Sequence, residues 1–285
     1  MSLSPLHGLS PYRRGFAIFR FVHAPVAPPP IDSDLLLRAY RSGIFPMADA
    51  RDDPDVFWVE PRRRAILPLD GFHCSRSLAK VLRKGTFTVT CNRAFAAVIG
   101  ACAGPRRDAG DTWISDRIEA SYVALHHEGH AHSIECWRGG ALVGGLYGVG
   151  FDHAFCGESM FSRFPDASKV ALAWLVAALR HARAALLDCQ FMTPHLATMG
   201  AVEIDEADYL ERLRIAQLSI DGPGAGLSGW AEGCGEGVES GLGANLALLP
   251  PEPLALPEGF AALLAAAGSA SSPGNFIAQS FTQTS

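Results

Sequence analysis

Apolar residues recur at helical spacing in several segments of the chain, and the longest of these covers 167–185. This segment predicts the principal helix. The string DSDLLLRAYRSG at 32–43 predicts a short helix that Ser33 caps and Gly43 ends. Further helices are expected over these ranges: 72–84, 92–104, 115–129, 195–200 and 206–214.

Alternating or continuous runs of β-forming residues separate these helices. Residues 55–69 are typical of two strands joined by a loop, and TFTVT at 86–90 alternates in the same way. HSIECW, ALVGGLYGVG and HAFCGESMF predict a β-meander, with glycines where a backbone or ligand comes close. ALLDCQF at 185–191 predicts a buried strand, and AVEI at 201–204 predicts a further one.

Strands followed by one long helix and another strand predict an α+β fold with a mixed-sheet core over 63–214. A small N-terminal α/β domain is expected over 31–62. Residues 1–30 end in a proline run and are predicted to be an extension. Residues 215–285 are rich in Gly, Ala and Pro, which predicts a flexible tail.

Composition narrows the class of protein. The chain has 285 residues, 48% of them hydrophobic and 19% charged, which is typical of a globular protein. The formal charge of −5 argues against a protein that coats nucleic acid indiscriminately. Seven cysteines, none spaced C-x-x-C, favour a reducing cytoplasm over a disulfide framework or a zinc site. The apolar run at 170–179 is about half the length of a membrane span, so no membrane segment is expected.

Two hydrolase-like motifs do not fit their own requirements. In LHHEGHAH, Glu128 stands one place too late for His-Glu-x-x-His, so solvated histidines at a helix end are the expected reading. In CGESMF, Phe161 occupies the position where G-x-S-x-G needs its second glycine, which argues against Ser159 as a nucleophile. Cys156 lies among apolar residues and is expected to be a small buried hydrophobe.

Asp188 and Gln190 are polar residues at i and i+2 of an otherwise apolar strand, so their side chains are expected on one face. An ionisable residue there must be paired, hydrogen-bonded or shifted in pKa, unless Asp188 caps a loop at the strand end. Glu158 ends a neighbouring strand and could approach Asp188. Two carboxylates in one pocket would attract a cationic group.

A concentration of basic residues lies between 62 and 84, opposed only by Asp70. Such a cluster is typical of a polyanion-binding surface, although a plain solvated face is the alternative. Its members are Arg62, Arg63, Arg64, Arg76, Lys80, Arg83 and Lys84. Ser168 and Lys169, at the start of the principal helix, are a second candidate anion site.

Taken together, these strings resemble the leucyl/phenylalanyl-tRNA–protein transferases. They run in the family's order from about 33 to 213: AYRSGIFPM, FWVEPRRRAIL, TWIS, AHSIECW, LVGGLYGV, FCGESMFS followed by ASK, LLDCQ and HLATMGAVEI. The resemblance implies a small N-terminal domain before a core similar to the GNAT acyltransferases. It also implies an enzyme that moves Leu, and less readily Phe or Met, from aminoacyl-tRNA to proteins beginning with Arg or Lys, which creates an N-degron.

The resemblance further implies roles for individual residues. Asp188 would polarise Gln190, whose carbonyl oxygen draws a proton from the attacking α-amine, and Glu158 with Asp188 would form the negative end of the acceptor pocket. Trp113 would stack on the terminal adenine of the tRNA. The apolar pocket for the aminoacyl side chain would consist of Leu146, Phe155, Met160, Phe161 and Leu175. An activated ester needs neither a cofactor nor a metal, and a cytoplasmic monomer is expected.

The chain departs from the family at three positions. Met47 stands where the family usually has a Trp beside the adenine, Val59 replaces the second Trp of a WW pair, and Leu146 replaces a Met. We therefore expect a looser grip on the 3′-adenosine. The alternatives are an acyl-CoA-dependent N-acetyltransferase and a non-catalytic binder of aminoacyl-tRNA. SRFPDASK before the principal helix lacks the glycine loop that pyrophosphate binding needs, which argues against acyl-CoA.

Overall fold

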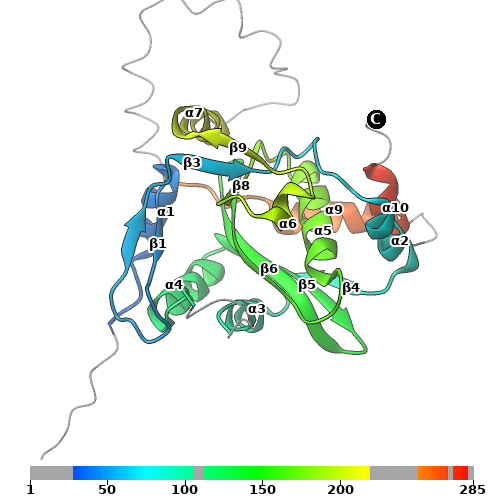
Figure 1. Cartoon of the computed structure of the whole chain (residues 1–285), viewed down its shortest axis with the longest axis horizontal. Helices are drawn as coiled ribbons and strands as arrows, with labels where there is room; N and C mark the ends of the chain where they lie inside the picture. The colour runs from blue at the N-terminus through cyan, green and yellow to red at the C-terminus, as the bar shows by residue number, and fades with distance from the viewer. Residues whose placement is uncertain (1–27, 105–111, 219–249, 269–271, 282–285) are drawn as a thin grey trace, which may run out of the picture.

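The computed structural model describes residues 28–104, 112–218, 250–268 and 272–281 (Figure 1). Its helices are α1 (Ser33–Arg41), α2 (Arg76–Lys84), α3 (Phe95–Cys102), α4 (Asp116–His127), α5 (Ala167–His181), α6 (Pro194–Ala197), α7 (Glu206–Gln217), α9 (Leu256–Ala267) and α10 (Pro273–Ser280). Its strands are β1 (Phe45–Met47), β2 (Phe57–Val59), β3 (Arg63–Ile66), β4 (Thr88–Cys91), β5 (Ala131–Arg138), β6 (Ala141–Phe151), β7 (Ala154–Ser162), β8 (Leu186–Gln190) and β9 (Val202–Asp205). No described helix is both long and apolar enough to cross a bilayer.

The predicted α+β class is confirmed by a mixed seven-stranded sheet in the order β4-β5-β6-β7-β8-β3-β9. Only β7 and β8 pair in parallel, and α5 makes the crossover between them. The helices predicted from periodicity are present, although α5 ends at His181 and α1 is capped by Asp32, whose side chain accepts a hydrogen bond from the Leu35 amide. β1 and β2 form a separate antiparallel ribbon before the sheet.

Helices cover both faces of the sheet (Figure 1). One face packs against α5, and α2, α9 and α10 extend the same apolar core. The other core joins residues of α1, α3, α4 and α7. The predicted close approach at a strand glycine occurs at Gly144 of β6, where an added Cβ would lie 2.4 Å from the Cβ of Ala167. Glycine there lets the first turn of α5 lie directly on the sheet.

The prediction of a flexible tail is wrong for residues 250–268 and 272–281, which form α9 and α10. Phe260 of α9 packs on Trp174 of α5 with ring centroids 5.4 Å apart, and Phe281 packs on Phe72 at 4.7 Å. Arg180 of α5 donates to the Ser280 carbonyl of α10 and to the Leu69 carbonyl, which connects α10 to the core. Average composition concealed the apolar residues that recur at helical spacing in α9. Residues 1–27, 219–249, 269–271 and 282–285 of the predicted extension and tail lie outside the described residues.

Candidate active site

A cavity of about 310 Å³ lies where the parallel strands β7 and β8 part. The two strands pair only from Ala154–Cys156 to Leu186–Asp188, after which β7 continues alone beside β6. The residues beyond this pairing, from Gly157 on β7 and from Cys189 on β8, line the cavity. An opening between two strands exposes side chains of both to one ligand, so the topology itself creates the site.

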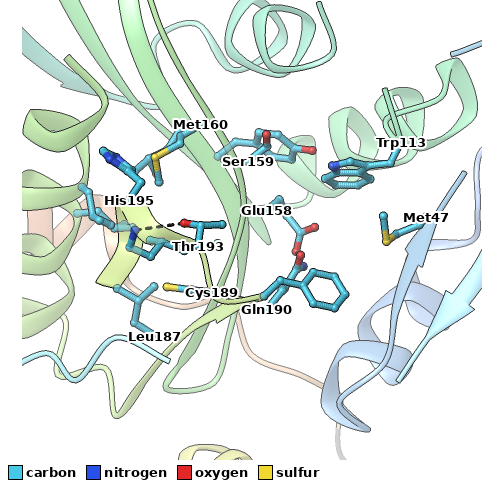
Figure 2. A pocket seen from close by; sticks show the side chains of 17 residues that line it. Met47, Trp113, Glu158, Ser159, Met160, Leu187, Cys189, Gln190, Thr193 and His195 are labelled. Carbon is cyan, nitrogen blue, oxygen red and sulfur yellow. Dashed lines mark hydrogen bonds between the residues drawn. The ribbon is translucent and has the colours of Figure 1, made fainter. Parts of the chain in front are cut away.

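Glu158 enters the cavity because of a β-bulge. The register with β6 places Tyr147 opposite Ser159 and Gly148 opposite Gly157, so Glu158 has no cross-strand partner. Bulges of this kind redirect side chains next to active sites. Figure 2 shows the Glu158 carboxylate beside Gln190, with Trp113 and Met47 to one side and Met160 and His195 to the other.

Three polar side chains surround Glu158, which is 8% exposed. Gln190 donates from Nε2 to Glu158 Oε1 at 2.9 Å, and Tyr122 donates from its hydroxyl to Oε2 at 3.2 Å. The Tyr40 hydroxyl of α1 makes a short hydrogen bond with that of Tyr122 and completes the network. Burial is the main cause that raises the pKa of Glu158 to about 7; the charge of Asp188 also raises it, and the hydrogen bonds oppose the shift. Glu158 therefore changes its charge near neutral pH.

Asp188 is fully buried and belongs to a different network. Arg64 donates from Nε to Oδ1 at 3.0 Å and from Nη2 to Oδ2 at 2.6 Å, and Tyr209 of α7 donates its hydroxyl to Oδ2 at 3.1 Å. The Arg64 guanidinium lies over the Phe45 and Tyr209 rings and also donates to the Gly43 carbonyl. This ion pair connects β8 to β3, α7 and the segment before β1.

The placement of Arg64 corrects the predicted basic surface. Arg64 is only 1% exposed, so it belongs to the interior rather than to a polyanion patch. Burial lowers the pKa of Arg64. The negative charge of Asp188 and the hydrogen bonds to it raise this pKa by more, so the net shift is upward. The sequence Arg62-Arg63-Arg64 does not indicate which arginine is buried. In the structure, Arg63 is exposed and Arg64 is buried along β3.

The remaining basic residues form two groups. Arg76, Lys80, Arg83 and Lys84 are exposed on α2, whose buried face consists of Leu78, Ala79 and Leu82. Arg62 and Arg63 lie at β3, where Arg63 pairs with Glu203 at 3.1 Å. In Figure 1, β3 lies above α1 and α2 lies beside α10 at the other end of the fold. One continuous patch from 62 to 84 is therefore not formed.

Gln190 has an unusual backbone conformation for a non-glycine residue, with φ of 62°. Its amide N–H donates to Asp188 Oδ1 at 2.7 Å, which stabilises this conformation. The register with β3 shifts between Ala65, opposite Gln190, and Ile66, opposite Asp188. The Asp188 carboxylate accepts from the Gln190 main chain, and the Gln190 side chain donates to Glu158. Backbone strain of this kind is concentrated at functional sites.

The structure separates the predicted aminoacyl pocket residues into three groups. Leu146, Met160 and Leu175 line the cavity, together with Leu172, Leu187 and Leu196. Phe155 is buried in the same core but does not line the cavity. Phe161 is on the opposite face, because the bulge at Glu158 reverses the alternation of β7 after that point. The prediction of Phe161 as a lining residue is therefore not met by this geometry.

Trp113 is half-buried and lines the same cavity beside Met47. The Ala48 amide donates to the Trp113 carbonyl at 3.2 Å, which connects the β1 segment to the loop before α4. Val59 on β2 is not a lining residue. Sequence reasoning missed Tyr147, Phe191 and His195, which line the cavity, because only the fold brings them together. It also missed Tyr40 and Tyr122, whose hydroxyls belong to the Glu158 network.

Two further expectations concern reactive side chains. His130 and His132 are buried rather than solvated; burial lowers the pKa of His132 to about 4. Within the described ranges, no cluster of His, Cys, Asp and Glu has a metal-binding arrangement. Cys156 is fully buried, as expected, and burial raises the pKa of its thiol well above its ordinary value.

The cavity combines apolar lining residues, Trp113 and one buried carboxylate where two parallel strands part. Such a site can hold an acyl group beside an amine, which is the arrangement that an acyl-group transferase requires.

Comparison with known proteins gives the family. Residues 66–214 match the family described as leucyl/phenylalanyl-tRNA protein transferase, and residues 30–62 match the N-terminal domain of that family. A protein of Novosphingobium aromaticivorans named leucyl/phenylalanyl-tRNA–protein transferase is 62% identical over 261 residues, which cover 91% of this chain and 99% of that protein. Proteins with the same name from Rhizorhabdus wittichii and Zymomonas mobilis are 59% and 60% identical, over 68% and 66% of this chain and 79% and 70% of their own. The chain belongs to the leucyl/phenylalanyl-tRNA–protein transferases, a family of aminoacyltransferases.

Proposed function

We propose that this protein transfers leucine, and also phenylalanine and methionine, from aminoacyl-tRNA to the N-terminal α-amine of proteins that begin with Arg or Lys. The observation that carries the proposal is the pairing of Glu158 and Gln190 at the junction of an apolar and an aromatic half-cavity. The three relatives are named as transferases of leucyl- and phenylalanyl-tRNA, which agrees with such a donor.

The donor fits across the two halves. Leu146, Met160 and Leu175 line a space with no charged group among them, which suits an unbranched or γ-branched side chain. An apolar pocket separates side chains that differ by one methylene by only about 1–3 kcal/mol, so Leu, Phe and Met can share it. Trp113 offers its ring to the terminal adenine, a stacking contact of about 1–3 kcal/mol.

The acceptor is selected by charge. Glu158 is the only carboxylate among the residues that line the described cavity. Asp188 is not a lining residue, and its charge is neutralised by the ion pair with Arg64. An N-terminal residue with a cationic side chain brings two positive charges, the α-ammonium and the side chain. The ionised form of Glu158 attracts both, and a neutral first residue lacks one of them.

The reaction needs a proton acceptor. The α-amine attacks the ester carbonyl carbon, the C–N bond forms, and the C–O bond to the tRNA ribose breaks. The α-ammonium nitrogen loses two protons in all: the first leaves before the attack, and the second passes from the attacking nitrogen to the departing ribose oxygen. Glu158 takes the first proton: its pKa of about 7 lies close to that of an α-amine, ordinarily about 7.7–8.0.

Gln190 positions the acceptor rather than holding its proton, because an amide is a very weak base. Its Nε2 is engaged by Glu158, so its Oε1 is the atom that accepts a hydrogen bond from the α-amine. Asp188 supports this by fixing the Gln190 backbone at φ of 62°. The ester is already activated, so the transfer requires neither ATP nor a cofactor.

The fold is proposed to be GNAT-like. Two features support this proposal: the parallel strands β7 and β8 part at the site, and α5 makes the crossover between them. The acyl-CoA alternative would need glycine-rich backbone at the α5 N-terminus to bind pyrophosphate. Residues 162–166 read SRFPD, and Asp166 places a negative charge at that position. We also propose that the enzyme works in the cytoplasm as a monomer.

The test is a transfer assay on the purified protein. Radiolabelled Leu-tRNA is mixed with a peptide that begins with Arg, and a matched peptide with an acetylated N-terminus is the control. We expect label on the free peptide alone. No transfer from an intact donor would exclude the proposal; binding of the donor without transfer would indicate a non-catalytic binder, and acetylation from acetyl-CoA would indicate the acetyltransferase alternative.

A further inference from the structure

Tyr147 of β6 is one of the residues that line the cavity. The side chain is fully buried, and its hydroxyl has no hydrogen-bond partner among the described residues. The other three tyrosines that the structure describes, Tyr40, Tyr122 and Tyr209, all have partners for theirs. A buried hydroxyl without a partner is unfavourable, so its presence in a cavity wall points to a ligand.

The Tyr147 ring is held rigidly. It makes edge contacts with Phe95 at 5.9 Å between centroids and with Tyr122 at 5.6 Å. Burial, with contributions from Tyr122 and Glu158, raises the pKa of Tyr147 well above its ordinary value. The hydroxyl therefore stays neutral, and it can both donate and accept a hydrogen bond.

The position of Tyr147 identifies the part of the ligand. Tyr147 belongs to the core on the α3 and α4 side of the sheet, and Trp113 and Met47 pack against that same core. Leu146 and Leu175 belong to the core on the α5 side. A donor with its adenine at Trp113 and its aminoacyl group in the α5-side half has its ribose between them.

We propose that Tyr147 binds the free hydroxyl of the terminal ribose of the donor, next to the ester oxygen. This rests on the proposed function. The terminal ribose carries one esterified and one free vicinal hydroxyl, and the free one needs a partner that both donates and accepts. Tyr147 thus selects a ribonucleotide end and fixes the ester relative to Glu158 and Gln190.

The experiment crosses an enzyme variant with a donor analogue. Wild type and Tyr147→Phe are each assayed with Leu-tRNA and with a Leu-tRNA whose terminal adenosine lacks the 2′-hydroxyl and is esterified at its 3′-oxygen. We expect wild type to lose about 5- to 150-fold in kcat/KM on the deoxy donor, the effect of leaving one buried polar group unpaired. Tyr147→Phe should show a similar loss on the normal donor and less than about threefold further loss on the deoxy donor. The crossed design cancels any intrinsic change in ester reactivity.

A melting curve separates binding from support of the fold. Removing a hydroxyl that has no protein partner should leave the melting temperature of the free enzyme unchanged or raised. Three results would each overturn the proposal. They are a lowered melting temperature of Tyr147→Phe, full activity of Tyr147→Phe on the normal donor, and a loss from Tyr147→Phe relative to wild type that is equal on the normal and the deoxy donor.

Failure of the proposed function is distinguishable. If wild type transfers nothing, binding is measured by calorimetry with leucine joined by an amide to 3′-amino-3′-deoxyadenosine, and with its 2′-deoxy counterpart. Discrimination by wild type that disappears in Tyr147→Phe supports the assignment without transfer, whereas equal affinities of the two compounds for wild type overturn it.

Discussion

Replacing Glu158 by Gln tests the proton acceptor with little change of shape. The variant keeps a planar group that can hydrogen-bond with Gln190 and Tyr122, but it carries no charge. We expect kcat to fall by about 10²- to 10⁴-fold, the usual contribution of a general base. In wild type, kcat/KM for the acceptor peptide should rise with a midpoint near pH 7, because the pKa of Glu158 is raised to about 7. The variant should lose this midpoint and retain only the titration of the peptide amine.

The same substitution should stabilise the fold at high pH. Folding raises the pKa of Glu158 from 4.5 to about 7, so the favourable contribution of the protonated carboxyl is present below pH 4.5 and is lost as pH rises through 7. At 1.36 kcal/mol per pKa unit, Glu158→Gln should gain about 2 to 3 kcal/mol relative to wild type between pH 5 and pH 8. Urea unfolding at both pH values measures this.

Glu135→Gln is the matched control. Glu135 is also fully buried and accepts hydrogen bonds from the Ser133 hydroxyl and the Ala94 amide, but it does not line the cavity. We expect its transfer activity per folded molecule to stay within about threefold of wild type. Activity of Glu158→Gln within the same margin, or an unchanged midpoint near pH 7, would refute the assignment of Glu158 as the proton acceptor.

Three other predictions follow from the same geometry. Arg64→Met should lower the free energy of unfolding, measured in urea, by about 3–5 kcal/mol because it leaves the buried Asp188 unpaired. The double variant with Asp188→Leu should recover part of this loss. Additive losses in the double variant would contradict the pairing. Met47→Trp should make the binding free energy of a leucyl-adenosine amide more favourable by about 1–3 kcal/mol through stacking, measured by calorimetry. Unchanged affinity would mean that Met47 does not face the adenine. Lys80→Glu with Arg83→Glu should raise the KM for Leu-tRNA and reduce its salt dependence, while the Kd for that small amide stays unchanged. An unchanged KM for Leu-tRNA would mean that the exposed face of α2 does not bind tRNA.

Periodicity and strand propensity were sufficient for most of the described secondary structure. The long apolar stretch of α5 and the β5–β6–β7 meander follow from local patterns that tertiary contacts reinforce. The ordered C-terminal helices were missed because an average over 215–285 concealed the residues of α9 and α10 that pack on α5 and α2. Local composition does not indicate which apolar surface elsewhere in the fold a segment will pack against.

The site was predictable in identity but not in geometry. Motif resemblance named Glu158, Asp188 and Gln190, and all three lie at the parting of β7 and β8. Two register shifts, at Glu158 and between Asp188 and Gln190, changed which side chains meet. A bulge depends on the pairing of two strands, so alternation along one strand misplaces Phe161.

The proposed reaction passes an aminoacyl group from tRNA to the α-amine of an N-terminal Arg or Lys. It can be followed by tandem mass spectrometry of an Arg-initial peptide after incubation with the enzyme, Leu-tRNA and acetyl-CoA together. We expect one product, with leucine joined by an amide bond to the α-nitrogen and none on internal lysine side chains. An acetylated N-terminus, leucine on side chains, or an unmodified peptide beside intact Leu-tRNA would contradict it.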